Sequence, residues 1–525
     1  MNAITMPQDG RRISMFGVLH ASYNGFMAFG LTLLYIALTV LSPGVLPQAI
    51  LSLHVNEIVG GLAIFACIPS LPGSKVGNLP DTYLVIGLIL SSMLSMIATG
   101  WLGGVVESTS LFVPVAIVFF FVAISVDTLQ RLKVLIGVMA LVGIFIFLQG
   151  LIAYYTGHLS SPYLEPQNVT DQETLYRFRG LGVLSDPNDF GQYLVTVIPL
   201  LWLRWKKGKF FLNFVFTLLP ASALMAGIFY THSRGAVMSI AVVLLFAFKE
   251  RLGPVKAGIL VAIAMVGILA LNVSGGRGMT NDDGGRVAAW MTALGVWKTH
   301  PLVGVGMGNF KDFNDTGLTA HNSYVLCLAE LGIIGYIFWM GLIVSNWNKL
   351  TMMIKLGKRT LSQSADKIGA KFQPQKAVGA ADGGWSQQNT SDVPARSLAF
   401  HQLRHAGAVP AGPGILTAGS PPRHLVSLST QRGGGVVADD AEVRFSAHVI
   451  RTAMVGTLAT AFFLSRTYSV TLYLVLGMAT ALWNLNQPHH PELMIPLPQL
   501  SKRILITVVV SIVGFYVFLR AIGLH

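Results

Sequence analysis

Long apolar runs, separated by short polar or glycine- and proline-rich stretches, dominate the chain. No Asp, Glu, Lys or Arg occurs from Ile13 to Asn56. A helix needs about 20 residues to cross the apolar core of a bilayer, so this stretch is long enough for two crossings. Ser42-Pro43-Gly44 and Pro47 mark the turn between them, because proline and glycine interrupt helices.

The same criterion predicts about twelve or thirteen membrane-spanning helices. We expect them near residues 24–42, 48–70, 82–100, 110–127, 132–155, 190–205, 210–230, 235–249, 255–273, 322–347, 449–466, 468–485 and 503–521. The predicted fold is therefore an all-α polytopic membrane protein.

Composition excludes the other broad classes of protein. Hydrophobic residues make up 53% of the chain and charged residues only 11%, whereas soluble domains carry about 25% charged residues. This excludes an ordinary soluble enzyme, a disordered protein and a nucleic-acid-binding protein. The formal net charge of +13 then indicates lysine and arginine in cytoplasmic loops, and we expect no nucleic-acid partner.

The basic residues also predict an orientation. If the N-terminus is cytoplasmic, most short basic clusters fall on the cytoplasmic side, which is the positive-inside pattern. These clusters are Arg11 and Arg12; Lys75; Arg131 and Lys133; Lys206, Lys207 and Lys209; Lys249, Arg251 and Lys256; Lys349, Lys355, Lys358 and Arg359; and Lys502 and Arg503. Two long segments, residues 156–189 and 274–321, then lie outside, together with a very short one at residues 231–234.

Four parts follow from this topology. Residues 1–155 hold the N-terminal spans, and residues 446–525 hold the C-terminal spans. Residues 156–347 form a core with both long outer segments, which we expect to be partly helical. Residues 361–445 are rich in Gly, Ala, Ser, Gln, Pro and Arg and show no periodicity, which predicts a disordered cytoplasmic loop.

Several basic residues lie in the outer segments, against the positive-inside tendency. They are Arg177, Arg179, Arg234, Arg277, Arg286 and Lys298. Snorkelling into the headgroups explains a single arginine, but several that converge on one face favour an anion site. Arg179 is a candidate for ligand contact, whereas the nearby Asp186-Pro187-Asn188 sequence is typical of a helix cap.

Arg234 lies between two predicted spans, after Thr231-His232-Ser233, where the next helix begins. The backbone N–H groups of a helix N-terminus and a guanidinium together form an anion site. Phosphate is the natural anion at a membrane surface. The alternative interpretation is a tight turn between helices with a snorkelled arginine.

Arg286 opens a segment that has an amphipathic helical pattern up to Lys298. The alternative here is a helix that lies on the membrane surface with both side chains solvated. Gly304, Gly306 and Gly308 follow, but no buried strand precedes them, so they are not a dinucleotide-binding fingerprint. We expect them to let a loop pack closely over the membrane surface.

His321 lies just before a long apolar helix, at the membrane edge. A neutral imidazole there can take a proton from a sugar hydroxyl, although a lone histidine is usually structural. Glu330 lies about 12–14 Å further along the same helix. A carboxylate at that depth is costly unless it is paired, so we expect Glu330 to anchor an arginine.

Four motifs occur in one order along the chain. They are Ser233-Arg234-Gly235-Ala236, Gly285-Arg286 with Trp290, the Pro-Leu-Val-Gly-Val-Gly-Met-Gly-Asn-Phe stretch at residues 301–310, and His321-Asn322-Ser323-Tyr324 with Glu-Leu-Gly-Ile-Ile-Gly at residues 330–335. This ordered set resembles the O-antigen ligase and polymerase superfamily over roughly residues 176–347. The insert at 361–445 departs from the short cytoplasmic loop usual in that superfamily.

The resemblance implies a bacterial inner-membrane glycosyltransferase that uses no metal and no other cofactor. Such enzymes take a glycan from undecaprenyl diphosphate on the periplasmic side and move it to lipid A-core, to another glycan or to a protein. The resemblance implies that Arg234 and Arg286, with Arg179 as a further candidate, bind the donor diphosphate, and that His321 deprotonates the acceptor hydroxyl. The supporting residues would be Ser233, Asn322 and Glu330. The outer loops contain no Asp-x-Asp cluster, in agreement with a metal-free site.

Three alternatives to a ligase stay open. A polysaccharide polymerase and a protein O-oligosaccharyltransferase belong to the same superfamily, and the sequence does not separate them. A transporter of lipid-linked glycans usually has polar groups near the bilayer midplane and internal repeats. Here the charged candidates gather at the outer edge, which disfavours the transporter. Besides the lipid-linked donor and the acceptor, we expect membrane lipids as partners.

Overall fold

The computed structural model describes residues 15–41, 53–71, 74–168, 174–270, 280–315, 317–371, 440–487, 490 and 494–521. The chain divides into two units. One comprises Met1–Leu361 and Ala438–His525, and the other comprises Ser362–Val437. The second unit is described only over residues 362–371, so the architecture below is that of the first unit.

Helices form nearly all of the described structure. In chain order they are α1 (Met15–Leu41), α3 (Val55–Cys67), α4 (Pro80–Ala98), α5 (Leu102–Ser125), α6 (Leu129–Tyr155), α7 (Pro187–Leu200), α8 (Phe210–Asn213), α9 (Leu219–Thr231), α10 (Arg234–Leu252), α11 (Pro254–Ala270), α12 (Thr280–Thr299), α13 (Ser323–Lys371), α14 (Asp440–Phe463), α15 (Val470–Asn486) and α16 (Leu497–Ala521). A π-helical turn at Phe214–Leu218 joins α8 to α9.

This architecture confirms an all-α polytopic membrane protein. Every predicted span overlaps one of these helices. Among the described residues, 6 helices are long and apolar enough to cross a membrane, and several shorter apolar helices accompany them. The number of crossings, twelve or thirteen, stays a prediction.

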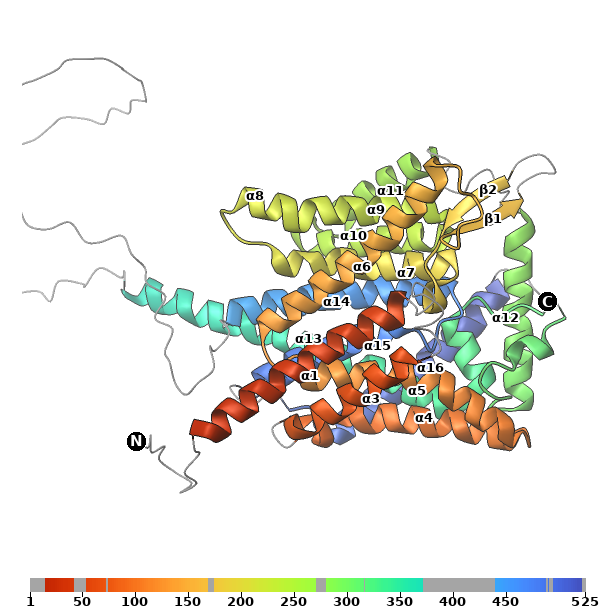
Figure 1. Cartoon of the computed structure of the whole chain (residues 1–525), viewed down its shortest axis with the longest axis horizontal. Helices are drawn as coiled ribbons and strands as arrows, with labels where there is room; N and C mark the ends of the chain where they lie inside the picture. The colour runs from red at the N-terminus through yellow and green to blue at the C-terminus, as the bar shows by residue number, and fades with distance from the viewer. Residues whose placement is uncertain are drawn as a thin grey trace, which may run out of the picture. The chain divides into compact units, whose positions relative to one another are not determined.

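Two groups of helices flank a central pair (Figure 1). α1, α3, α4 and α5 lie on one side, the helices from α6 to α11 lie on the other, and α14 and α15 run between them. α15 packs on α5, while α14 packs on α7 and α10. Every residue of α15 from Val470 to Trp483 is buried, as expected of a helix that is apolar all round. α11 and α16 instead expose apolar side chains, such as Val255 and Val510, which suit contact with lipid.

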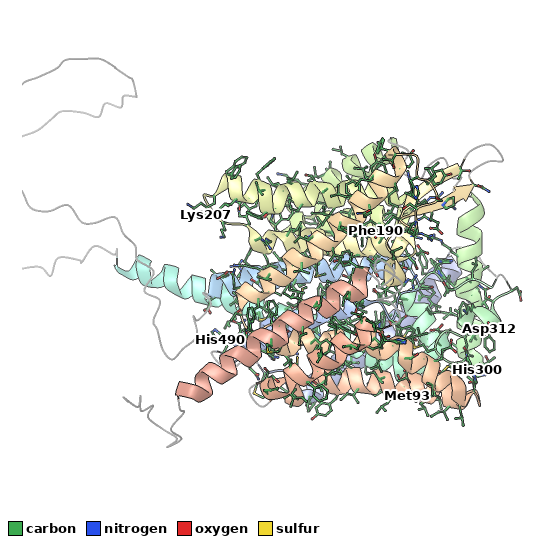
Figure 2. All side chains as sticks on the ribbon, in the orientation of Figure 1. Met93, Phe190, Lys207, His300, Asp312 and His490 are labelled. Atoms are coloured by element: carbon green, nitrogen blue, oxygen red, sulfur yellow. The ribbon has the colours of Figure 1, made fainter. Side chains whose placement is uncertain are left out.

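The two ends of the bundle carry different predicted loops. Figure 2 shows Lys207 at one end, whereas His300 and Asp312 lie at the other. Lys207 belongs to a predicted cytoplasmic cluster, and the other two residues belong to the second outer segment. The structure thus separates predicted inside from predicted outside along the bundle.

The first outer segment contains a β-hairpin, where the sequence led us to expect helical character. β1 (Leu164–Asn168) pairs antiparallel with β2 (Thr174–Phe178), and Leu164 lies opposite Phe178. Each strand has only 5 residues, which is too short for its alternating pattern to stand out in the sequence. The second outer segment is helical in part, because it contains α12.

α13 is interrupted at Gly332, whose backbone is non-helical with φ 62° and ψ −166°. The loop at residues 301–306 forms backbone hydrogen bonds with α13 on both sides of this interruption. Ile333 N–H donates to Pro301 O (2.9 Å), and Val305 N–H donates to Ala329 O (3.0 Å). Backbone groups freed inside a membrane helix need partners, and this loop supplies them. The segment at residues 301–306 is therefore fixed onto α13.

The edges of the insert differ from the predicted disordered loop. α13 continues to Lys371, and α14 begins at Asp440 with Asp440 and Glu442 in its first turn. Acidic side chains stabilise a helix N-terminus through its dipole, which accounts for the start of α14. The rest of that prediction, residues 372–439, lies outside the described residues.

Candidate functional site

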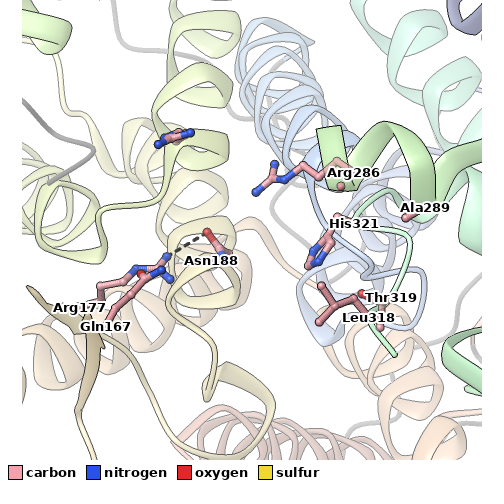
Figure 3. Close-up of a pocket in the computed structure, with 10 residues that line it drawn as sticks. Gln167, Arg177, Asn188, Arg286, Ala289, Leu318, Thr319 and His321 are labelled. Atoms are coloured by element: carbon pink, nitrogen blue, oxygen red, sulfur yellow. Dashed lines mark hydrogen bonds between the residues drawn. The ribbon is translucent and has the colours of Figure 1, made fainter. Parts of the chain in front are cut away.

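A cavity of about 260 Å³ is lined mainly by residues of the predicted outer segments. Its lining residues are Gln167, Arg177, Asn188, Arg234, Gly285, Arg286, Ala289, Leu318, Thr319 and His321. Figure 3 shows Gln167, Arg177 and Asn188 on one side, facing Arg286 and His321 across the opening. Three of the outer arginines thus converge with the histidine around one space.

The first wall is built around Arg177, which is only 7% exposed. Its Nε donates to Thr231 O (3.0 Å), and its Nη2 donates to Asn188 Oδ1 (3.2 Å). The Ser233 hydroxyl donates to the same Asn188 oxygen (2.7 Å). These bonds tie β2, α7 and the turn before α10 together, and they hold the guanidinium at the cavity.

Arg234 is the first residue of α10, as its sequence context predicted. The buried Ser233 is the N-cap, and its hydroxyl accepts from Ala236 N–H (3.3 Å). His232 adopts a left-handed conformation with φ 48° and ends α9, so one tight turn separates the two helices. The helix N-terminus adds partial positive charge beside the Arg234 guanidinium.

The second wall carries Arg286 and His321. Arg286 lies on α12, and His321 precedes α13 with a positive φ of 49°. Asn322 is fully buried, and its side-chain oxygen accepts from Tyr324 N–H (2.9 Å) and Val325 N–H (3.3 Å). Asn322 therefore caps α13, and these bonds hold the backbone directly after His321 in place.

The Ser323 side chain links this wall to the loop between α14 and α15. Its hydroxyl donates to Leu464 O (2.6 Å) and accepts from Arg466 N–H (2.8 Å). Arg466 in turn forms an ion pair with Asp189, which follows Asn188 on α7. The loop thus connects the start of α13 to the start of α7, and so it joins the two walls.

The ionised side chains among the ten lining residues are all positive. None of its ten lining residues is Asp or Glu, and three are arginines. Among the described residues no group of three His, Cys, Asp or Glu side chains could hold a metal ion. An anion with several oxygens, such as a diphosphate, is the ligand that three guanidinium groups fit best.

Arg179 lies outside this lining. Its Nε donates to Pro162 O (3.1 Å), and its Nη1 lies 3.4 Å from Ser185 O. Arg177 occupies the cavity instead, together with Asn188, which sequence reasoning had assigned to capping. Asp186 does act as the cap, because its side chain accepts from Asn188 N–H (2.7 Å). Alternation along a strand would place Arg177 and Arg179 on the same face, but β2 ends at Phe178, so Arg179 lies in the segment that follows the strand.

Glu330 does not anchor an arginine, so that expectation is corrected. Its side chain is 3% exposed and accepts from the Tyr468 hydroxyl (3.2 Å). The backbone amides of Gly308 and Phe310 also interact with it. A carboxylate acceptor suits these N–H donors, so Glu330 holds the loop that carries the glycines.

The glycines of residues 301–310 are needed for close packing. Gly304 has φ 71°, and a Cβ there would overlap the Glu330 carbonyl; a Cβ on Gly332 would overlap Leu302 O. The loop backbone therefore contacts the interrupted α13 backbone directly. The prediction of a closely packed loop is met, although its partner is a helix and not the membrane surface.

Residues 218–340 match the O-antigen ligase family. No curated protein matches the chain. The family match confirms the resemblance over this stretch, which contains Arg234, Arg286 and His321, while Arg177 and Asn188 lie before it. It supports glycosyl transfer of the ligase or polymerase type by a multi-pass membrane protein.

Proposed function

We propose that this protein, which carries an O-antigen ligase domain at residues 218–340, transfers a glycan from an undecaprenyl-diphosphate-linked donor to an acceptor such as lipid A-core. The reaction takes place at the periplasmic face of the bacterial inner membrane. One observation carries the proposal: Arg177, Arg234 and Arg286 line a single cavity with His321, and none of the described residues that line it is a carboxylate.

The arginines bind and stabilise the diphosphate. Their guanidinium groups stay charged at any physiological pH and pair with phosphate oxygens through two donors at once. When the bond between the glycan and the diphosphate breaks, negative charge grows on the leaving oxygen. Preorganised positive groups around that oxygen lower the barrier, so these arginines would act in binding and in transfer.

His321 acts as the base. Its neutral imidazole accepts the proton of an acceptor hydroxyl, and the hydroxyl oxygen attacks the anomeric carbon of the donor glycan. A carbon–oxygen bond forms to the acceptor while the carbon–oxygen bond to the diphosphate breaks. The products are the glycosylated acceptor, protonated His321 and undecaprenyl diphosphate. Arg179, Ser233, Asn322 and Glu330 are supporting residues in this proposal, outside the cavity lining.

The test is a transfer assay on the purified protein in proteoliposomes with an undecaprenyl-diphosphate-linked glycan. We expect His321→Ala to lower transfer by roughly 100-fold or more, within the range of general-base contributions, with the protein still inserted. His158→Ala is the matched control, because His158 is exposed at the end of α6. EDTA is expected to leave transfer unchanged.

The acceptor identifies the subclass. Transfer to lipid A-core indicates a ligase, chain growth indicates a polymerase, and transfer to a protein indicates an O-oligosaccharyltransferase. Movement of the lipid-linked glycan across the bilayer without transfer to any acceptor would overturn the proposal in favour of a transporter.

A further inference from the structure

An aromatic cluster lies behind the wall that carries Arg286 and His321. It consists of Trp290, Tyr324, Phe462, Phe515 and Phe518, from α12, α13, α14 and α16. We propose that this aromatic cluster positions Arg286 and His321 for the reaction. The C-terminal helices, which lie outside the matched residues 218–340, thereby complete the site. The expected effect on the rate of transfer rests on the proposed function, whereas the expected effect on the position of Arg286 and His321 does not.

Trp290 connects the cluster to Arg286. It follows Arg286 by four residues on α12, so the two side chains lie one helical turn apart on the same side. Trp290 is only 7% exposed, and its ring centroid lies 5.8 Å from Phe462, 5.5 Å from Phe515 and 6.3 Å from Phe518. These are ordinary distances for interacting aromatic pairs, so α12 is held against α14 and α16.

Tyr324 connects the same cluster to His321. It follows His321 by three residues at the start of α13, and its ring lies 6.5 Å from Phe462. Its hydroxyl donates to Leu458 O on α14 (3.3 Å). Arg286, which is proposed to bind the donor, and His321, which is proposed to activate the acceptor, are therefore both linked to the same aromatic cluster.

The wall belongs to a small apolar core of its own. Buried residues of this core come from α12, from the loop before α13, from the first turns of α13 and from α16; they include Trp290, Ala293, Ala320, Val325 and Leu519. The opposite wall is built on the main core, to which Phe178 and Ala236 belong. Phe178 directly follows Arg177 in the sequence, and Ala236 lies two residues after Arg234.

The cavity thus lies between two apolar cores, which are linked by Trp297, a side chain that packs against both, while Tyr324 packs against the larger one. The placement of Arg286 and His321 relative to Arg177 and Arg234 depends on how the smaller core is held. Catalytic groups lose effect when they shift by about an ångström, which can cost roughly 100-fold in rate. Loss of a ring from the aromatic cluster is expected to produce such a shift without removing any group that touches the substrate.

The kinetic test uses Trp290→Ala, Trp290→Phe and the control Val510→Ala, whose side chain is 64% exposed on α16. We expect Trp290→Ala to lower kcat/KM by roughly 10- to 100-fold. Trp290→Phe, which keeps a ring, and Val510→Ala should stay within about 3-fold of wild type. The key comparison repeats Trp290→Ala in an Arg286→Lys background, where the further loss in kcat/KM should be smaller than in wild type, because the part of the effect that acts through Arg286 is already removed while the part that acts through His321 is left.

A second measurement does not depend on activity. Gly285→Cys places a thiol at the cavity edge, where a Cβ meets nothing within 4 Å, while Cys67 and Cys327 are buried. We expect a polar maleimide to label this thiol several-fold faster when Trp290→Ala is added, and at an unchanged rate when Val510→Ala is added.

The outcomes separate the two proposals. If wild type transfers no glycan but labelling accelerates, the proposed function fails and the positioning role stands. If Trp290→Ala costs the same factor in the wild-type and Arg286→Lys backgrounds, or leaves labelling unchanged, the positioning role is overturned.

Discussion

At the residue scale, the neighbours Arg177 and Arg179 show what a sequence pattern leaves open. Both are basic residues in the first predicted outer segment, and both depart from the positive-inside tendency. Arg177 donates to Thr231 O and to Asn188 and lines the cavity, whereas Arg179 donates to Pro162 O and lies outside it. The end of β2 at Phe178 separates them, because Arg177 lies in the hairpin and Arg179 follows it, and that boundary is not visible in the spacing of the arginines.

Arg177→Lys is the first residue-scale prediction. Lysine keeps the positive charge but lacks the planar fork whose separate nitrogens reach Thr231 O and Asn188 and which can pair side-on with diphosphate oxygens. We expect the KM for the lipid-linked donor to rise by roughly 10-fold, equivalent to one or two kcal/mol of binding. Initial rates of transfer over a range of donor concentrations measure it. Lys298→Gln on α12 is the control, and an unchanged KM in Arg177→Lys would remove this residue from donor binding.

At the element scale, the interruption of α13 explains two motifs that the sequence presents separately. Gly304 and Gly332 lie far apart in the chain, yet each allows the loop and the helix to approach with backbone against backbone. The bonds from Ile333 N–H to Pro301 O and from Val305 N–H to Ala329 O replace those that the interrupted helix lacks. The loop is therefore a structural part of the wall that carries His321.

Gly304→Ala is expected to destabilise the protein by about 1–3 kcal/mol, because the added methyl overlaps the Glu330 carbonyl and the backbone has to shift. Thermal unfolding in detergent is the measurement. Gly258→Ala on α11 is the matched control, since a Cβ there meets nothing within 4 Å and no positive φ is involved. Equal midpoints for the two variants would contradict the close packing of the loop.

A buried ion pair joins α4, α13 and α15. Asp81, at the start of α4, is fully buried and pairs with Lys349 of α13. It also accepts from Ser345 and from Thr480 of α15 (2.7 Å). Charged groups within a membrane protein are costly unless they are paired in this way.

Removal of one partner should leave the other charge buried and unpaired. We expect Lys349→Met to destabilise the protein by about 3–5 kcal/mol. Replacement of both, as Asp81→Leu with Lys349→Met, should restore much of that loss because no charge is left buried. The unfolding midpoints of the single and double variants measure this. A double variant that is no more stable than the single one would contradict the pairing.

At the scale of the whole molecule, a predicted cytoplasmic basic cluster and the predicted outer segments that line the cavity lie at opposite ends of the bundle. Lys207 is at one end of the bundle, and His300 and Asp312 are at the other (Figure 2). The cavity is built from the hairpin, α12 and the loop before α13, all of which belong to predicted outer segments. The positive-inside pattern thus predicts which end faces the periplasm.

Reporter fusions test this orientation. We expect a periplasmic reporter such as alkaline phosphatase to be active when fused within residues 311–315, and inactive when fused at Lys207. A cytoplasmic fluorescent reporter should give the opposite result, because the charge bias of the short loops sets the orientation during insertion. Activity of alkaline phosphatase at Lys207 would invert the topology and place the cavity on the cytoplasmic side.

The sequence by itself determined the all-α membrane fold, the helices behind every predicted span, and the candidates Arg234, Arg286 and His321. These follow from apolar runs and local motifs, whose physics acts over a few turns of chain. Tertiary structure alone decided that Arg177 and not Arg179 lines the cavity, that Glu330 holds the glycine loop, and that the aromatic cluster lies behind Arg286. Those relations join residues far apart in the chain, and only the packing of helices against one another brings them into contact.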